Sequence, residues 1–286
     1  MNLRVSAVQY PLKTLASFQE FSEIVVHYVK TAKEFASEVV LFPEFLTTQF
    51  LSFRELMQNN SIDQLPGYTK RYVELFSLLA KEYNLHIIAG THVTKRDEKL
   101  YNTAYLFYPD GTYQTQDKIH ITPTEKHDWN IQAGESFSLF HIKEIPVAIL
   151  TCYDMEFPEL ARIAREQGAE IFFCPSCTDD RHGFYRVRYS SHARAIENQV
   201  YIVGTGTIGS LPTVDYMRAN IGQASILSPN DIGFPPGGVI DEGIMNQDMM
   251  ITGDLNMEVL RKSRTNGSVS TWQDRRKEFY KREGKK

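Results

Sequence analysis

A cysteine stands at the end of an apolar segment, where a reactive side chain would be accessible to a ligand. Residues 145–150 predict a strand, Cys152 follows them, and Phe157 and Pro158 begin an expected helix. Such a turn lies at the carboxyl edge of a sheet, where α/β proteins bind ligands and backbone N–H groups can face an oxyanion. Most free cysteines instead pack as small hydrophobic residues, so the local sequence allows a nucleophile or a buried thiol.

Glu44 occupies a similar position after a second apolar segment. Residues 38–43 are apolar after the first and predict a strand that is covered on both faces. Between Pro43 and Phe45, a carboxyl group would be partly removed from water, which raises its pKa and suits it to general acid–base catalysis. The alternative is an exposed glutamate in a loop, the usual place of this residue type.

Lys118 ends the second strand of an expected hairpin. Residues 103–108 and 112–118 form two β segments around a Pro-Asp-Gly turn at 109–111. Alone, this lysine would be a solvated charge at a strand end. Beside a cysteine nucleophile, a cation would favour the thiolate and bind an oxyanion, so its interpretation depends on whether the fold brings it near Cys152.

Four segments, in order, resemble the motifs of the nitrilase (carbon–nitrogen hydrolase) superfamily. They are Phe-Pro-Glu at 42–44, Lys-Ile-His-Ile-Thr-Pro-Thr-Glu at 118–125, Thr-Cys-Tyr-Asp-Met-Glu-Phe-Pro-Glu at 151–159 and Arg-Ala-Ile-Glu-Asn-Gln-Val-Tyr at 194–201. Glu44, Lys118 and Cys152 resemble the Glu-Lys-Cys triad of that family, as do the intervals of 74 and 34 residues between them. The resemblance extends from the first strand to about residue 275.

The resemblance implies a role for each member of this triad. Glu44 would be the general base that takes the thiol proton and later activates water. Lys118 would stabilise the tetrahedral oxyanion together with the backbone N–H of Tyr153. Cys152 would form a thioester as ammonia or an amine leaves, and the covalent intermediate would divide one difficult hydrolysis into two easier steps.

Glu125 lies seven residues after Lys118. Many members of the family keep a second glutamate between the lysine and the cysteine, and the resemblance implies that Glu125 orients the substrate or the lysine. The alternative is a surface ion pair with the neighbouring Lys126.

The rest of the chain alternates strands and helices. Apolar residues from 18 to 35 recur at steps of three and four and predict an amphipathic helix. The alternation indicates one α/β domain over residues 1–286, with a polar C-terminal tail from about residue 262 and a long loop at 231–243. The resemblance implies a four-layer α-β-β-α sandwich of the carbon–nitrogen hydrolase type, and a homodimer or higher homo-oligomer that stacks helices at a two-fold interface.

Composition limits the classes of protein to consider. The net charge of −4 argues against a nucleic-acid or membrane-surface protein, and 42% apolar and 23% charged residues are typical of soluble globular proteins. No apolar segment approaches the roughly 20 residues of a transmembrane helix, and the first ten residues do not form a signal peptide. The cytoplasm, where thiols stay reduced, is therefore the expected location.

Two motifs point to cofactors but lack the required context. Cys-Pro-Ser-Cys at 174–177 has the spacing of a redox or zinc motif, but there is no second pair at a suitable distance. Gly-Thr-Gly-Thr-Ile-Gly at 204–209 follows a strand, but the Ser-Leu-Pro that comes next begins no helix to hold a pyrophosphate. We therefore expect neither a metal nor a cofactor.

The predicted function is hydrolysis of a non-peptide carbon–nitrogen bond, from an amide or carbamoyl compound to an acid plus ammonia or an amine. Nitrile hydrolysis is the alternative: members acting on nitriles commonly carry Trp and Glu after the cysteine, whereas Tyr-Asp-Met at 153–155 resembles the amide branch. A non-catalytic binding relative is a further alternative, against which the complete triad argues.

The substrate itself is not predictable from the sequence, but some pocket residues are candidates. Tyr153, Phe184, Tyr185 and Trp129 would make an aromatic pocket, and Arg181 or Arg188 would bind a carboxylate. The pattern also resembles a bacterial branch in which the hydrolase is often fused to an acetyltransferase domain. Because this sequence begins at the first strand of the hydrolase, we expect that partner to be absent or encoded separately.

Overall fold

Strands and helices alternate along the chain in the computed structural model, which describes residues 2–57 and 59–284. The strands are β1 (Asn2–Leu12), β2 (Val39–Leu41), β3 (His86–Arg96), β4 (Lys99–Phe107), β5 (Tyr113–Asp117), β6 (Ile131–Gln132), β7 (Phe140–Ile142), β8 (Ile145–Ile149), β9 (Ile171–Ser176), β10 (Tyr201–Gly209), β11 (Ser225–Leu227), β12 (Val239–Glu242) and β13 (Met249–Asn256). The α-helices are α1 (Phe18–Glu34), α2 (Thr69–Tyr83), α3 (Pro123–His127), α4 (Pro158–Glu166), α5 (Arg181–Asn198), α6 (Met257–Asn266) and α7 (Lys277–Glu283). Short 3₁₀ helices are η1 (Leu46–Ser52), η2 (Ile62–Tyr68) and η3 (Cys152–Glu156).

The strands form two half-sheets that are joined at one corner. One half has the order β5-β4-β3-β2-β1 with β13 beside β1, and the other has the order β10-β9-β8-β7 with β11 and β12 beyond β10. β1, β2 and β3 run parallel, as do β10, β9 and β8. The last three residues of β1 pair in parallel with the last three of β10, and this pairing joins the halves.

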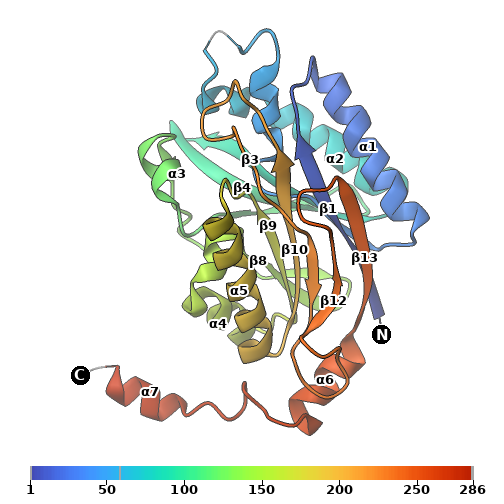
Figure 1. Cartoon of the computed structure of the whole chain (residues 1–286), viewed down its shortest axis with the longest axis vertical. Helices are drawn as coiled ribbons and strands as arrows, with labels where there is room; N and C mark the ends of the chain where they lie inside the picture. Colours follow the sequence, from blue (N-terminus) through green and yellow to red (C-terminus); the bar gives the residue numbers. More distant parts are fainter. Residues whose placement is uncertain (1, 58, 285–286) are drawn as a thin grey trace.

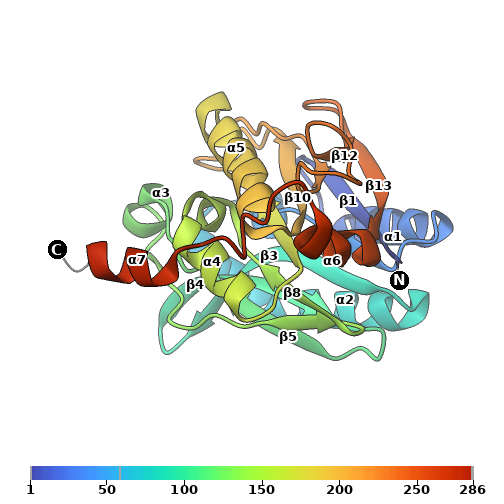
Figure 2. The same ribbon diagram turned by 90° about the horizontal axis from the view of Figure 1, so that it is seen from below.

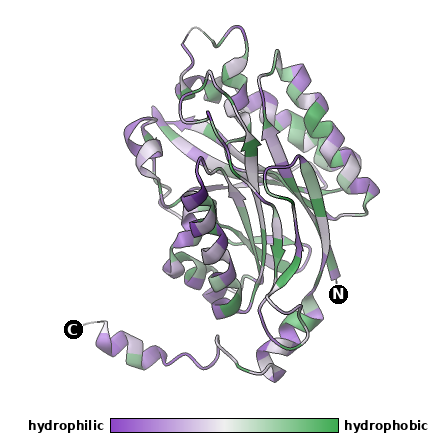
Figure 3. Cartoon of the chain, viewed as in Figure 1, coloured by the Kyte–Doolittle hydropathy of each residue, from purple (hydrophilic) through white to green (hydrophobic). Residues whose placement is uncertain are grey.

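Alternate residues of each strand enter different cores, so the strands and helices form four layers. In β1, Val5 and Ala7 belong to a core that also contains Ile171 and Phe173 of β9, so the two half-sheets pack face to face. The opposite faces of the first half pack under α1 and α2, and those of the second half under α4 and α5. Figure 1 shows these helix pairs on opposite sides of the strands, and Figure 3 shows the apolar strands between helices with polar outer faces.

The predicted amphipathic helix near the N-terminus is confirmed. The hydroxyl of Ser17 accepts a hydrogen bond from the N–H of Glu20 and caps the start of α1. The apolar residues at three- and four-residue steps pack in the outer core, except Phe35, which follows the end of the helix and is exposed. The hairpin predicted over residues 103–118 is confirmed as β4 and β5, and so is the alternation of strands and helices from 145 to 209. Because residues 204–209 continue β10, the glycine-rich motif there begins no helix.

The C-terminal region is more ordered than its polar sequence predicted. The expected tail from about residue 262 begins inside α6, which continues to Asn266 because Met257 and Leu260 are buried in the core between the sheets. Farther on, Trp272 and Arg275 pack beside α4, and Figure 2 shows this segment leading to α7. The expected loop at 231–243 contains β12, which pairs with β11.

The outer surface of α5 carries exposed aromatic side chains. Tyr185 and Tyr189 stack with their ring centroids 5.5 Å apart, and both are exposed. The homodimer that the resemblance implies stays a prediction. Among the helices of the described residues, none is long and apolar enough to cross a membrane.

Gly90 in β3 provides a test of how closely the first half-sheet approaches the segment before Glu44. Its φ is +69°, and a Cβ there would lie 1.9 Å from the carbonyl oxygen of Pro43. We expect Gly90→Ala to lower the free energy of unfolding by about 1–3 kcal/mol, measured by denaturant titration, because side chains disfavour this conformation and the Cβ clashes with backbone. Gly67→Ala is the control, since its Cβ would meet no heavy atom within 4 Å. Equal stability of both variants would contradict this packing.

Candidate active site

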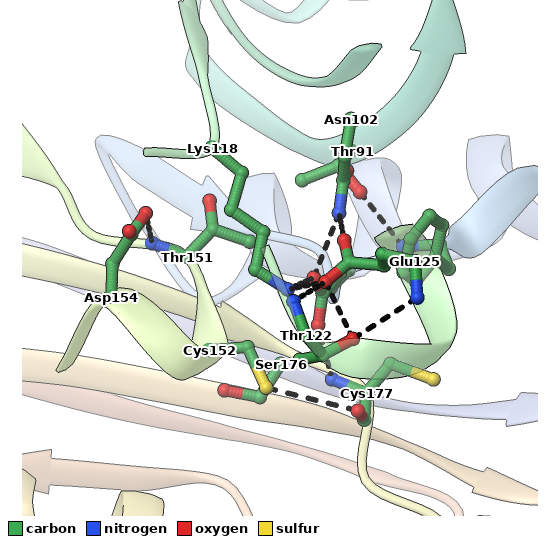
Figure 4. Close-up of polar contacts among 12 residues, drawn as sticks. Thr91, Asn102, Lys118, Thr122, Glu125, Thr151, Cys152, Asp154, Ser176 and Cys177 are labelled. Atoms are coloured by element: carbon green, nitrogen blue, oxygen red, sulfur yellow. Dashed lines mark hydrogen bonds and ion pairs between the residues drawn. The ribbon is translucent and has the colours of Figure 1, made fainter. Parts of the chain in front are cut away.

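The ends of three strands bring the predicted site residues to one cavity. Glu44 follows β2, Lys118 follows β5 and Cys152 follows β8, while Glu125 comes from α3. All four line a cavity of about 510 Å³, together with Tyr153. Figure 4 shows Lys118 extending toward Glu125, with Cys152 close to the Cys177 backbone.

A buried ion-pair network forms the centre of this site. The Nζ of Lys118 lies 2.8 Å from Oε1 of Glu44 and 2.6 Å from Oε2 of Glu125. The three residues are only 1–2% exposed. A buried ammonium group is tolerated only when it is paired and hydrogen-bonded, and here two carboxylates fulfil that condition. The alternatives of a solvated lysine and an exposed Glu44 are therefore excluded.

Asn102 joins the two carboxylates and shares Oε1 of Glu44 with Lys118. Its Nδ2 donates to Oε1 of Glu44 at 2.9 Å and to Oε1 of Glu125 at 2.7 Å. Asn102 is fully buried in β4, one strand away from the hairpin end that carries Lys118. This residue was not predicted from the sequence, because a strand asparagine becomes informative only once its two partners are known to converge.

Glu125 is held in place by hydrogen bonds at the start of α3. Its Oε2 accepts hydrogen bonds from the N–H and the hydroxyl of Thr122, both at 2.9 Å, which forms a capping box at the start of α3. Pro123 occupies the first turn, where its missing N–H costs nothing. The alternative of a surface pair with Lys126 is therefore wrong, because the Glu125 side chain turns inward to Lys118.

Glu44 is fixed by contacts from the loop that follows β9. The backbone N–H of Cys177 donates to Oε2 of Glu44 at 2.9 Å. The next residue, Phe45, has a φ of +54°, and its N–H donates to the hydroxyl of Thr91 at 2.9 Å. Three donors thus hold the carboxylate of Glu44: Lys118, Asn102 and the Cys177 N–H.

Cys152 lies in a strained turn between β8 and α4. Its φ is +48°, a conformation that side chains rarely adopt and that is concentrated at functional sites. The side chain is 6% exposed, and its Sγ lies 3.7 Å from the carbonyl oxygen of Cys177. This turn directs the sulfur toward the cavity rather than into the core, although Cys152 also contacts the outer apolar core.

Asp154 connects the turn of Cys152 to the segment that follows Lys118. Its carboxylate accepts from the N–H of His120 at 2.8 Å and from the N–H of Thr151 at 3.2 Å. Nδ1 of His120 lies 2.9 Å from the same carboxylate. The contacts fix the positions of the two strand ends relative to each other, so Asp154 is a positioning residue. The sequence motif contained it, but we did not single it out.

Burial governs the protonation of the site. Burial and the neighbouring Glu44 raise the pKa of the Cys152 thiol well above its ordinary value, although Lys118 lowers it. Lys118 thus favours the thiolate, as expected, but burial and Glu44 outweigh it in the free protein. Burial also raises the pKa of Glu44, as its apolar flanks predicted, while Lys118 opposes that rise. Burial by itself lowers the pKa of Lys118, but Glu125 and Glu44 outweigh it and raise this pKa.

The outer part of the cavity agrees only partly with the predicted pocket. Tyr153 and Trp129 line it, but Phe184 and Arg188 line a separate, smaller cavity. Tyr185 and Arg181 are exposed residues outside both linings. The arginine that lines the active-site cavity is Arg186, which lies on α5 between the two predicted arginines. The sequence did not show which side of α5 faces the cavity.

The cysteine and acidic residues of the described chain do not form a metal site. No group of three or more His, Cys, Asp or Glu side chains in residues 2–57 and 59–284 is placed to hold a metal ion. Cys152, Cys174 and Cys177 are all free thiols. The Cys-Pro-Ser-Cys segment is the end of β9 and the loop that holds Glu44.

Comparison with known proteins identifies the family. Residues 4–234 match the carbon–nitrogen hydrolase family. The chain is 44% identical to the probable hydrolase YhcX of Bacillus subtilis over 97% of its own length, and it spans 54% of the length of that relative. It is 26% identical to the omega-amidase NIT2 of Xenopus tropicalis, over 99% of this chain and 98% of that protein.

The fold is also similar to that of a solved structure. A carbon–nitrogen hydrolase from Helicobacter pylori G27 superposes with a TM-score of 0.81 at 18% identity, covering all of this chain and 99% of that chain. The α/β fold with two packed half-sheets and flanking helices is therefore the fold of this family, as the resemblance implied. The chain belongs to the carbon–nitrogen hydrolase family of the nitrilase superfamily.

The raised pKa of Cys152 leads to a test that needs no substrate. At pH 7 we expect iodoacetamide to alkylate Cys152 at least about tenfold more slowly in the folded protein than in the guanidinium-unfolded chain, because little thiolate is present and the sulfur is buried. The rate should rise with pH. Mass spectrometry of the peptide containing Cys152 gives the rate at each pH. Rapid, pH-independent labelling of the folded protein would show that the thiolate forms without a substrate.

Proposed function

We propose that this protein hydrolyses amides of small molecules through a thioester on Cys152. The observation that carries the proposal is the buried network of Lys118, Glu44 and Glu125, which shares one cavity with a cysteine in a strained turn. A packed, inert cysteine would require neither the strain nor the buried charges. The omega-amidase relative supports an amide as the substrate class.

In the first half of the reaction, Glu44 accepts the proton of the Cys152 thiol as the sulfur attacks the carbonyl carbon. The raised pKa of Glu44 makes it a stronger base than an ordinary carboxylate. Its pKa is therefore closer to that of the thiol whose proton it accepts. Collapse of the tetrahedral intermediate breaks the carbon–nitrogen bond, and the proton on Glu44 passes to the leaving nitrogen. Ammonia or an amine departs, and the acyl group stays on sulfur.

In the second half, water takes the place of the thiol. Glu44 removes a proton from water as its oxygen attacks the thioester carbon, and the carbon–sulfur bond then breaks. The proton returns to the sulfur, which restores Cys152, and the acid is released. One base thus serves both halves, which explains why three donors hold the Glu44 carboxylate in a single position.

The negative charge on the carbonyl oxygen needs a positive counterpart in both halves. Lys118 supplies it, because Glu125 and Glu44 keep its ammonium group protonated. The backbone N–H of Tyr153 is a second donor in this proposal. Tyr153 lies in the first turn of η3, where N–H groups have no acceptor within the helix, and it lines the cavity.

The proposal predicts a pattern of substrates. We expect ammonia release from a panel of ω-amides and carbamoyl amines, and none from arylacetonitriles. Cys152→Ala should lower kcat by at least about 10⁴-fold, because the nucleophile is lost. Intact-mass measurement of the unchanged protein, acid-quenched during turnover of a good amide, should show an added acyl group, and Glu44→Gln should show none, because Glu44 is the base of both halves.

Three outcomes of this panel would contradict the proposal differently. Hydrolysis of nitriles alone would favour the nitrilase alternative. Tight binding of an amide with no ammonia release and no acyl adduct would favour a binding protein. Unchanged activity in Cys152→Ala would exclude the thioester altogether.

Asn102 provides a test of positioning that leaves the three proposed catalytic residues unchanged. Activity requires ionised Glu44, so kcat/KM falls as the pH falls through the pKa of Glu44. Asn102→Leu removes a hydrogen bond to the carboxylate, which raises that pKa further and moves the acid limb of the profile to higher pH. We also expect kcat to fall by about 10²-fold, because two carboxylates lose their common donor.

The control for this variant is Asn59→Leu, at an exposed asparagine outside the cavity. It should leave the pH profile in place. Thermal unfolding of both variants separates a local effect from a loss of folded protein. If Asn102→Leu lost activity without any movement of the acid limb, its role would be structural only.

A further inference from the structure

The charged residues that line the active-site cavity are unevenly paired. The lining contains two cations, Lys118 and Arg186, and four carboxylates. Lys118 is bound by Glu44 and Glu125, and Nε of Arg186 lies 3.1 Å from Oε2 of Glu156. In the described lining, therefore, each cation already has a carboxylate partner. A substrate carboxylate would meet no unpaired positive charge there.

The fourth carboxylate, Asp179, has neither a hydrogen bond nor an ion pair within the described part of the chain. It is exposed and lines the cavity two residues after Cys177. The residues around it are fixed. The hydroxyl of Thr178 donates to the carbonyl of Ile221 at 2.6 Å, and Asp180 caps α5 by accepting from the N–H of Gly183. Asp179 thus presents an uncompensated negative charge from an anchored position.

The wall of the cavity is aromatic on the side formed by α3 and the loops near it. Trp129 packs against Phe45 with ring centroids 5.1 Å apart, and against Tyr216 at 6.0 Å, both nearly perpendicular. All three residues line the cavity, as does Tyr153. Aromatic faces attract ammonium groups and offer apolar contact to methylene chains. They give no attraction to a carboxylate.

From this pairing we infer that the substrates are amides whose acyl chain carries a protonated amine, with the ammonium group attracted by Asp179 and the aromatic wall. The inference rests on the proposed amide hydrolysis and adds the substrate class. It differs from simple transfer of a substrate from an amidase relative, because it derives from charges in this cavity. The negative lining would also repel the carboxylate of an ω-amide that ends in an acid.

A matched set of three amides tests the inference. 5-Aminopentanamide, hexanamide and 5-carbamoylpentanoate share a four-methylene spacer and end in an ammonium, a methyl and a carboxylate group. We expect kcat/KM to be at least tenfold higher for the ammonium compound than for hexanamide, and lowest for the carboxylate. The same comparison with two- and three-methylene spacers tests whether the distance from Cys152 to Asp179 suits a shorter acyl chain. Added salt should reduce the preference, because Asp179 is exposed.

Asp179→Asn supplies the decisive variant. The ratio of kcat/KM for 5-aminopentanamide to that for hexanamide should fall at least fivefold, and a ratio is insensitive to a general loss of activity. Asp97→Asn is the control, because Asp97 is an exposed aspartate in the turn between β3 and β4. An unchanged ratio in Asp179→Asn would overturn the role of Asp179.

The two proposals fail in different ways. The enzyme could instead prefer 5-carbamoylpentanoate and lose that preference in Arg186→Met. This result would overturn the cationic substrate and assign Arg186 as a carboxylate ligand, while the proposed amide hydrolysis would stand. Absence of hydrolysis and of acyl adducts with every amide at every spacer length would overturn the proposed function, and the substrate class with it.

Discussion

The buried ammonium group of Lys118 is the constraint on which the rest of the site depends. Removing an ion from water costs several kcal/mol even after the protein relaxes, and a carboxylate without a partner in the same place would be no cheaper. Lys118 and its two glutamates are therefore tolerable only together, at 2.8 and 2.6 Å. Both glutamates accept from Asn102, Glu44 also accepts from the backbone of Cys177, and Glu125 also accepts from Thr122. The network is nearly complete before any substrate enters.

Two half-sheets packed face to face supply the rigidity that such a network needs. Glu44 and Lys118 follow strands of one half and Cys152 follows a strand of the other, so the distance between base and nucleophile is set by sheet packing. Asp154 adds a direct link between the halves through the backbone of His120. Positive φ angles at Phe45 and Cys152 then turn the chain sharply at the strand ends. Folding energy from the cores maintains these strained turns where the side chains must converge.

The sequence was most informative where the spacing of apolar residues and the turn residues that bound a segment indicate the same element. Strands near 3, 39, 86, 145, 171 and 201, and the helix from Phe18, follow from apolar runs and three- and four-residue steps. The layers required the family resemblance, because the same alternation fits several α/β folds. α6 was missed because two buried residues, Met257 and Leu260, are too few to show a period in a polar segment. Within the site, Glu44 and Glu125 were identified by motif, but Asn102 and Arg186 depend on strand register and helix phase.

The raised pKa of the Cys152 thiol has a physical reason that also clarifies the chemistry. A cation close to a cysteine lowers its pKa, but the same enclosure that keeps Lys118 dry also removes water from Cys152, and Glu44 adds a negative charge beside it. Burial and the carboxylate prevail over the ammonium group. A neutral thiol next to a carboxylate of raised pKa is a pair in which the proton moves only when the sulfur gains a bond to carbon. Such a site would remain protonated and unreactive until an acyl group arrives, and its resting state would be protected from the electrophiles that a free thiolate attracts.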